Sequence, residues 1–334
     1  MHPFELTRQL IDIESITPDE FEVGNFVWNY LSDLVARFDG RAERLPVEPR
    51  RDNIFVCFGQ PTVTLSTHLD TVPPFFPARE DSTHIWGRGA CDTKGIIAAM
   101  ITAAEQLLAA GHRNLALLFV VGEERNSAGA KAAAQTPRGS RFLINGEPTG
   151  NKLALGSKGA LRYLVRASGR MAHSAYPELG ESAIDKLLTA LARVRAVPLP
   201  ENSLLGKSTL NIGRIEGGRA PNVIADSASA ELLIRVVDDA VALRSAIEQA
   251  ATPEARAEEV LLIPAVELGS LDGFPTTVVA FTTDIPAFEG AWGRPFLIGP
   301  GSIHVAHTAD ENIPKAELLD AIEIYKRLTL ELGR

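Results

Sequence analysis

Histidine and carboxylate residues recur at the points where apolar, strand-like segments of the sequence end. His68 and Asp70 follow one such segment, and Glu123 and Glu124 follow another that is wholly apolar. Three further candidates come after other predicted turns and strands: Asp92, Glu147 and His307. Because ligands of open α/β sheets bind at the carboxyl ends of the strands, we expect these side chains to share one crevice.

Imidazoles and carboxylates together suit a divalent transition metal such as zinc. Without a cation, several carboxylates in one cleft would repel one another and raise one another's pKa values. Two cations about 3.5–4 Å apart would remove this conflict and form a hydrolytic two-metal site. The residue types therefore predict a dinuclear metal centre.

The spacing within the two pairs adds detail to this prediction. His68 and Asp70 are two residues apart, so they share one face of an extended strand. Asp70 can then accept the N–H of His68 and fix the tautomer of its ring. Glu123 and Glu124 are neighbours and should point to different sides, so one can bind metal while the other stays free as a base.

Strands and helices alternate in the first part of the chain, which predicts a layered α/β domain. Thr17, Pro18 and Glu20 have the pattern of a capping box, so we expect a helix that begins there. The other predicted elements are strands at 62–67, 115–121 and 141–145, and helices at 94–110 and 127–135.

The pattern changes after about residue 155 and predicts a second domain. The order there is strand, helix, strand, strand, helix, strand, a split unit of the ferredoxin-like kind. The α/β pattern then resumes with a strand at 295–298 and a closing helix at 314–332. We therefore expect a catalytic domain of residues 1–155 plus 270–334, interrupted by an inserted domain of residues 156–269.

Composition excludes several other classes of protein. With 45% hydrophobic and 22% charged residues among 334, the chain is not disordered. A net charge of −9 without basic runs argues against nucleic-acid binding. No apolar run is long enough for a membrane helix, and the N-terminal residues lack a secretory pattern. Only Cys57 and Cys91 are present, so we expect a reducing, cytoplasmic location.

Six segments, in this order along the chain, resemble the signature segments of one enzyme family. They are LSTHLDTVPPF, WGRGACDTKGIIAAM, VVGEERNSAGA, INGEPTG, MAHSAYPELGESAI and GPGSIHVAHTADENI. The family is that of the dinuclear zinc amidohydrolases and exopeptidases. It includes acetylornithine deacetylase, acetyl-lysine deacetylase, succinyl-diaminopimelate desuccinylase, aminoacylases and glutamate carboxypeptidases. The resemblance implies a zinc-exopeptidase-like α/β/α domain with an inserted βαββαβ lid domain that dimerises.

The resemblance also implies a set of metal ligands for two divalent ions, zinc first, with cobalt or manganese as alternatives. The implied ligands are two pairs and a bridge: His68 with Glu147, Glu124 with His307, and Asp92 between the two ions. His304 competes with His307 for the last position. The resemblance favours His307, because Glu311 follows it by four residues as in the family.

Other residues take catalytic and substrate-binding roles by the same resemblance. Glu123 is the general base and Asp70 orients His68. His173, in the inserted domain, polarises the scissile carbonyl, often in the partner subunit's site. Asn222 and Arg235 occupy positions that hold the substrate carboxylate, for which the fork of an arginine is suited.

Simpler structural roles stay open for some residues. His173 could be a core or interface histidine, Asn222 a turn residue and Arg235 one half of a strand-end salt bridge. Cys91 adjoins Asp92, but no base pairs with it, so we interpret it as a small buried residue. The segment after Glu124 lacks the further acidic residue that many relatives have, which bears on substrate choice.

The sequence as a whole predicts a homodimeric, metal-dependent hydrolase that uses a metal-activated water. We expect it to remove the acyl group from an N-acyl amino acid, like the compact deacetylases of arginine and lysine biosynthesis. A dipeptidase or carboxypeptidase with the same site is the alternative. A metal-free binding paralogue is a third possibility, but it should lack a ligand or the base, and none is missing.

Overall fold

The computed structural model describes residues 1–334, and these form two compact units. Unit 1 comprises Met1–Leu155, Leu268–Thr277 and Thr283–Arg334, and unit 2 comprises Gly156–Glu267 and Val278–Thr282. The expected inserted domain, 156–269, differs from unit 2 in its end and in the short return segment. No helix in either unit is both long enough and apolar enough to cross a membrane.

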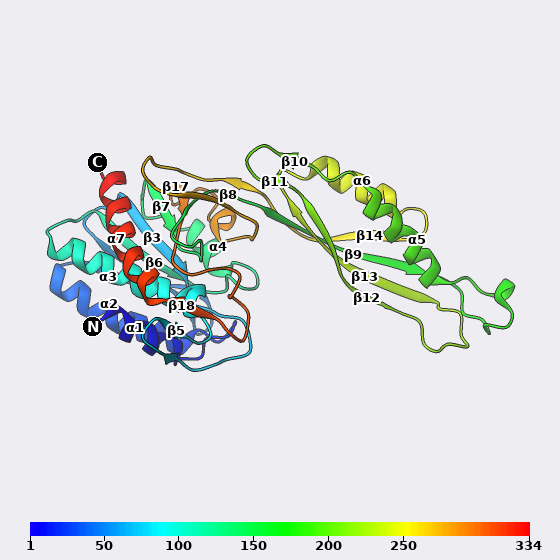
Figure 1. Cartoon of the computed structure of the whole chain (residues 1–334), viewed down its shortest axis with the longest axis horizontal. Coiled ribbons are helices and arrows are strands. Elements are labelled where there is room, and N and C mark those ends of the chain that lie inside the picture. Colours follow the sequence, from blue (N-terminus) through cyan, green and yellow to red (C-terminus); the bar gives the residue numbers. More distant parts are fainter. The chain divides into compact units, whose positions relative to one another are not determined.

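Unit 1 is built on a six-stranded sheet (Figure 1). Its strands, in order across the sheet, are β1 (Arg41–Glu48), β2 (Arg51–Phe58), β6 (Leu115–Val120), β3 (Val63–His68), β7 (Phe142–Asn145) and β17 (Arg294–Leu297). The last four run parallel, whereas β1 and β2 add an antiparallel edge that the sequence pattern did not predict. Because β3 lies between β6 and β7, the carboxyl ends of these three strands meet at a switch point of the topology.

Helices cover both faces of this sheet. One face carries α1 (Pro3–Ile11), α2 (Phe21–Phe38), α3 (Gly95–Ala109) and α7 (Lys315–Leu332), which share the larger core of the unit. The other face carries α4 (Ala128–Ala134) and the 3₁₀ turn η3 (Ile285–Phe288), which pack around Trp292. The expected α/β/α layering is thereby confirmed.

Short elements complete unit 1 and its connections. A π-helical turn, η1 (Ala90–Lys94), precedes α3. One small sheet contains β18 (Asn312–Pro314), β5 (His84–Trp86) and β4 (Arg79–Glu80), and another contains β15 (Val266–Glu267), β8 (Leu153–Ser157) and β16 (Thr276–Val279).

The predicted capping box at the start of α2 is wrong. The helix begins at Phe21, and its N-cap residue Glu20 makes no side-chain hydrogen bond to the helix. Glu20 instead accepts two hydrogen bonds from Arg51, at 2.7 and 2.6 Å, and Thr17 donates its hydroxyl to Asp70 at 2.7 Å. Buried tertiary partners thus replace the local cap, because a buried carboxylate is stabilised more by a guanidinium than by one backbone N–H.

Unit 2 has the expected ferredoxin-like order. Its main elements are β9 (Gly159–Ser168), α5 (Ala183–Ala196), β12 (Thr209–Gly217), β13 (Ser227–Val236), α6 (Val241–Ala251) and β14 (Arg256–Ile263). The sheet is antiparallel with the order β12-β13-β9-β14, and alternate residues of β9 and β13 form a core with the two helices. The remaining elements are η2 (Pro177–Leu179), β10 (Glu201–Asn202) and β11 (Gly206–Lys207).

Close packing fixes the segment between β6 and α4. The buried side chain of Asn53 donates to the carbonyl of Gly129 at 2.8 Å and accepts from the N–H of Val121 at 3.1 Å. A Cβ atom on Gly129 would lie 2.5 Å from the nitrogen of Val121 and 2.6 Å from its oxygen. Only glycine fits there, so the start of α4 is held directly against the end of β6.

We predict that Gly129→Ala lowers the free energy of unfolding by about 1–3 kcal/mol, as overpacking against backbone atoms does. Gly24→Ala is the matched control, because Gly24 is also helical but a Cβ atom on it would have no heavy atom within 4 Å. There the substitution should stabilise by about 0.5–1 kcal/mol. Denaturant unfolding of both variants checks this, and equal effects would contradict it.

Candidate metal centre

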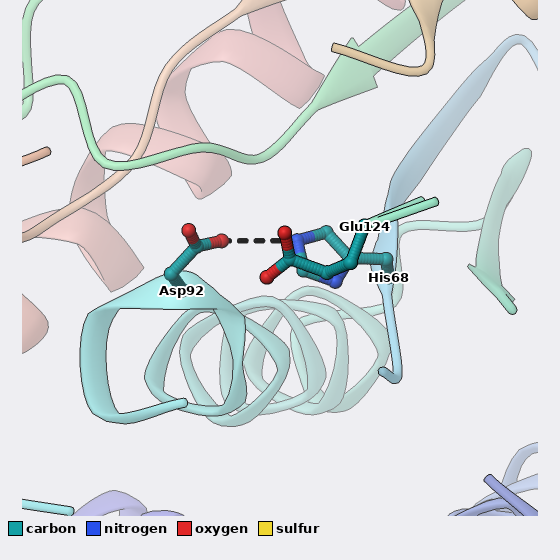
Figure 2. Close-up of side chains that lie close together, drawn as sticks. All are labelled: His68, Asp92 and Glu124. Atoms are coloured by element: carbon teal, nitrogen blue, oxygen red, sulfur yellow. Dashed lines mark hydrogen bonds and ion pairs between the residues drawn. The ribbon is translucent and has the colours of Figure 1, made fainter. Parts of the chain in front are cut away.

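Three side chains from separate elements converge at the carboxyl ends of the parallel strands. His68 ends β3, Asp92 lies in η1, and Glu124 follows β6. One ligand atom of each lies within 4.8 Å of the others, and the Nε2 atom of His68 is 3.0 Å from Oδ1 of Asp92 (Figure 2). One nitrogen and two carboxylate oxygens facing a common point are a donor set that zinc and similar ions accept.

His307 brings a fourth side chain to this cluster. Its Nε2 atom lies 3.1 Å from Oε1 of Glu124 and 3.3 Å from Oδ2 of Asp92. Its backbone is in the left-handed region, with φ of 62°, and its side chain is 49% exposed. The backbone N–H of His304, the competing candidate, donates to the hydroxyl of Ser302 at 3.3 Å, and its ring makes no hydrogen bond. The structure therefore brings His307, and not His304, to the cluster.

Glu147 supplies a buried carboxylate beside the same cluster. It follows β7, is 4% exposed, and its Oε1 atom has no hydrogen-bond partner. The charge of His68 lowers the pKa of Glu147, and the charge of Asp92 raises it. A buried, unpaired carboxylate oxygen is costly, and a bound cation would remove that cost. The donor set and this orphaned oxygen together fit a metal centre.

The carboxylate of Asp70 holds the loop that carries the glutamate pair. Its Oδ1 atom accepts the backbone N–H of Gly122 at 2.9 Å and that of Glu123 at 3.1 Å. Its Oδ2 atom accepts the backbone N–H of Glu124 at 3.1 Å, in addition to the Thr17 hydroxyl. One buried carboxylate thus fixes the backbone of three consecutive residues.

Asp70 also orients His68, but chiefly through its backbone. The Nδ1 atom of His68 is 2.9 Å from the carbonyl oxygen of Asp70 and 3.5 Å from its Oδ1 atom. The ring therefore donates to a carbonyl, and the predicted hydrogen bond to the carboxylate is the longer contact. Either way Nδ1 carries the proton, which leaves Nε2 free to bind a metal.

The charges of the cluster shift one another's protonation. Hydrogen bonds to Asp92 and Glu124 raise the pKa of His307 to about 10. Burial raises the pKa values of Glu123 and Glu147 well above their usual range. The charge of Glu147 adds to the rise at Glu123, and the charge of Asp92 adds to the rise at Glu147. The carboxylates of the cluster repel one another, and bound cations would compensate their negative charges.

Asp284 is a further carboxyl group of the crevice, and the sequence pattern does not predict it. It precedes η3, is 1% exposed, and neither of its oxygens has a hydrogen-bond partner. Burial raises its pKa to about 7, and the charges of Asp70 and Glu124 add to the rise. The nearby hydroxyl of Ser127 lowers the pKa of Asp284 in part. No spacing pattern in the sequence connects Asp284 to the other residues.

The three predicted substrate-site residues all belong to unit 2. His173 forms a bridge with Val223, and the N–H of Ser174 donates to the carbonyl of Asn222 at 3.0 Å. The structure therefore brings His173 and Asn222 together. Arg235 lies in β13, is half-buried, and makes no ion pair or side-chain hydrogen bond, so the salt bridge considered for it is absent.

Comparison with known proteins places the chain among peptidases. Residues 64–331 match the model of peptidase family M20/M25/M40. A peptidase M20 domain-containing protein of Schizosaccharomyces pombe is 37% identical over 97% of this chain and 83% of its own length. A probable carboxypeptidase of Aspergillus clavatus is 39% identical over 96% and 80%. The solved structure of an M20 family metallo-carboxypeptidase from Sulfolobus solfataricus superposes with a TM-score of 0.78, at 16% identity, over 98% of both chains.

We predict that Asp284→Asn stabilises the metal-free protein above neutral pH. A carboxyl group whose pKa rises from 3.8 to about 7 on folding takes up a proton, so it lowers the unfolding free energy as the pH rises between these values. Melting temperatures measured in a chelator should therefore coincide near pH 4. The variant should melt a few degrees higher near pH 8, since about 1 kcal/mol corresponds to a few degrees. A constant difference at all pH values would contradict this.

Proposed function

Because the chain belongs to peptidase family M20/M25/M40, we propose that it hydrolyses the amide bond next to the free carboxylate of a small N-acyl amino acid or peptide. The expected enzyme class, a metal-dependent hydrolase of amide bonds, is confirmed by that membership. The observation that carries the proposal is the convergence of His68, Asp92, Glu124 and His307 in one crevice.

We propose that two divalent ions, zinc first and cobalt or manganese otherwise, bind in this crevice. Asp92 suits the bridging position, because its Oδ1 faces His68 while its Oδ2 faces His307. Glu147 would join His68, and Glu124 would join His307. When bound, the ions supply Lewis acidity that activates water and polarises the scissile carbonyl.

Glu123 is the proposed general base. Its neighbour Glu124 faces His307, whereas the side chain of Glu123 makes no hydrogen bond and lies partly buried near the carboxyl groups of Glu147 and Asp284. Burial and the charge of Glu147 raise its pKa, which favours taking up a proton from the attacking water and giving it to the leaving amine. Asp70 holds the backbone of Glu123, so the carboxylate is presented from a fixed position.

Unit 2 supplies the proposed contacts to the substrate. Arg235 is half-buried without an anionic partner, and that burial lowers its pKa, so a substrate carboxylate would compensate its charge. The Nδ1 atom of His173 accepts the N–H of Ala175 at 3.1 Å. The proton of the neutral ring therefore sits on Nε2, where it can be donated to a carbonyl oxygen. Asn222, beside His173, is the third proposed contact.

Two candidates differ on the acyl side of the scissile bond. The sequence favours a deacetylase of the acetylornithine or acetyl-lysine type. The relative named a probable carboxypeptidase, which is 39% identical, favours a peptide substrate instead. The substrates of both candidate enzymes carry a free carboxylate on the amine side of the scissile bond. We therefore propose that this carboxylate is required for cleavage.

A substrate panel tests this requirement. Protein loaded with zinc or cobalt should hydrolyse dipeptides or N-acetyl amino acids with a free carboxylate. The matching C-terminal amides should be cleaved at least about 100-fold more slowly, because Arg235 would then be left unpaired. Equal cleavage of acids and amides would refute the proposed orientation. The ratio of dipeptide to acetyl substrates decides between the two candidates.

Replacement of the neighbouring glutamates should separate the base from a ligand. We expect about two ions per chain in the wild type by elemental analysis. Glu123→Gln should keep that metal content and lose at least about 10²-fold in turnover, as the loss of a general base does. Glu124→Gln should lower the metal content. If Glu123→Gln retains most of the activity, the two roles are exchanged or absent.

We propose that two copies assemble through unit 2 and that His173 serves the partner's site. The edge strand β12 has one side unpaired, and Leu188 on α5 is 53% exposed, so unit 2 offers a free sheet edge and an apolar side chain for an isologous contact. His173→Ala should cost about 10²–10³-fold, like the loss of other oxyanion donors.

Mixing inactive His173→Ala chains with inactive Glu123→Gln chains should then restore activity, because each mixed dimer has one intact site. No recovery after demonstrated subunit exchange would assign His173 to its own chain. Full activity of His173→Ala alone would make it a structural residue.

A further inference from the structure

A buried ion pair lies directly behind the candidate metal centre. The Nη1 atom of Arg88 is 2.5 Å from Oε2 of Glu311, and each residue is 1% exposed. Arg88 also donates through Nε to the carbonyl of Pro74 at 3.1 Å, and its guanidinium stacks on the ring of Phe76 at 4.7 Å. Nε, Nη1 and the face of the guanidinium therefore each have a defined neighbour in the segment 74–76 or in Glu311.

The other oxygen of Glu311 reaches the backbone of Asp92. Its Oε1 atom accepts the N–H of Asp92 at 3.3 Å, and its backbone carbonyl accepts the N–H of Gly87 at 3.1 Å. Glu311 thus holds both ends of the segment 87–92. It also lies four residues after His307, so one side chain connects the two chain segments whose side chains meet at the cluster.

The conformation of Asp92 needs such support. Its φ of −127° and ψ of 81° are not helical, and neither are the angles of Thr93, so the turns of η1 and α3 do not fix it. The contacts that fix it are the N–H bond to Glu311 and the side-chain contacts to His68 and His307. Without the hydrogen bond to Glu311, only the contacts to His68 and His307 would orient the carboxylate of Asp92.

We propose that Arg88 and Glu311 are positioning residues for the metal centre, which set the carboxylate of Asp92 midway between its two histidine neighbours. This inference rests on the proposed metal-binding function. Arg88 aligns the carboxylate of Glu311 through their ion pair, and Glu311 transmits that alignment to the backbone of Asp92. Groups that support ligands in this way commonly change metal affinity by about 10–100-fold.

Stability and positioning can be separated with single and double variants. Removing one partner of a buried ion pair leaves an uncompensated charge, whereas replacing both by apolar residues of similar volume is often neutral. Glu311→Leu should therefore lower the melting temperature of the metal-free protein. The double variant Arg88→Met with Glu311→Leu should recover most of that loss. Neither variant can accept the N–H of Asp92.

The measurement is zinc affinity by competition with a chromophoric chelator, alongside melting of the metal-free protein. We expect the double variant to melt near the wild type yet bind the more weakly held ion at least about tenfold less tightly. Wild-type affinity in the double variant would make the pair merely structural and overturn the inference. If the wild type itself holds no zinc, the proposed function fails, and this inference fails with it.

Two further variants keep the test decisive. If the double variant does not fold, Glu311→Asp replaces it, because it retains the charge but withdraws the oxygen from Asp92. The same tenfold loss supports the inference, and unchanged affinity overturns it. Glu43→Gln is the control, since it breaks the ion pair with Arg138, 2.7 Å long and partly exposed, in the same unit. A similar loss of affinity there would show a nonspecific effect and also overturn the inference.

Discussion

Mutual repulsion among buried carboxylates is the constraint on which unit 1 depends. Six carboxyl groups act on one another in its crevice, and only two imidazoles accompany them: Asp70, Asp92, Glu123, Glu124, Glu147 and Asp284, with His68 and His307. Such a set is unfavourable unless the surrounding structure holds it rigidly or cations compensate it. The six-stranded sheet supplies the rigidity, because several of these side chains follow the carboxyl ends of its parallel strands.

Backbone N–H groups supply a second part of the solution. Asp70 is fully buried, yet three successive N–H groups and one hydroxyl compensate its charge. Burial opposes its ionisation, but His68 and Thr17 bring its pKa below the usual value. The same bonds fix the loop that carries Glu123 and Glu124. The negative charge of Asp70 would otherwise add to the repulsion among the carboxylates. Here it orders the backbone of Glu123, the proposed base, and of Glu124, a proposed metal ligand.

The parts of this architecture that the sequence predicted are those that follow from local pattern. Apolar runs located β3, β6 and β7, and the polar residues at the end of each strand or within four residues of it located most of the cluster. Contacts between distant segments were not predictable in this way. Thr17 and Glu20 matched a capping box, but buried partners far along the chain bind them instead. Asp284 carries no spacing signal, since only the packing of η3 brings its charge to the others.

Burial differs between the two ends of the proposed centre, and this difference gives it a direction. His68 and Glu147 are almost fully buried, whereas the side chain of His307 is half exposed. Asp92 faces both histidines and so joins the buried end to the open one. A substrate can approach only from the exposed side, so the ion held by His307 and Glu124 would meet solvent first. The buried end would then serve to fix the bridging carboxylate, which agrees with the hydrogen bond that the backbone N–H of Asp92 donates to the buried Glu311.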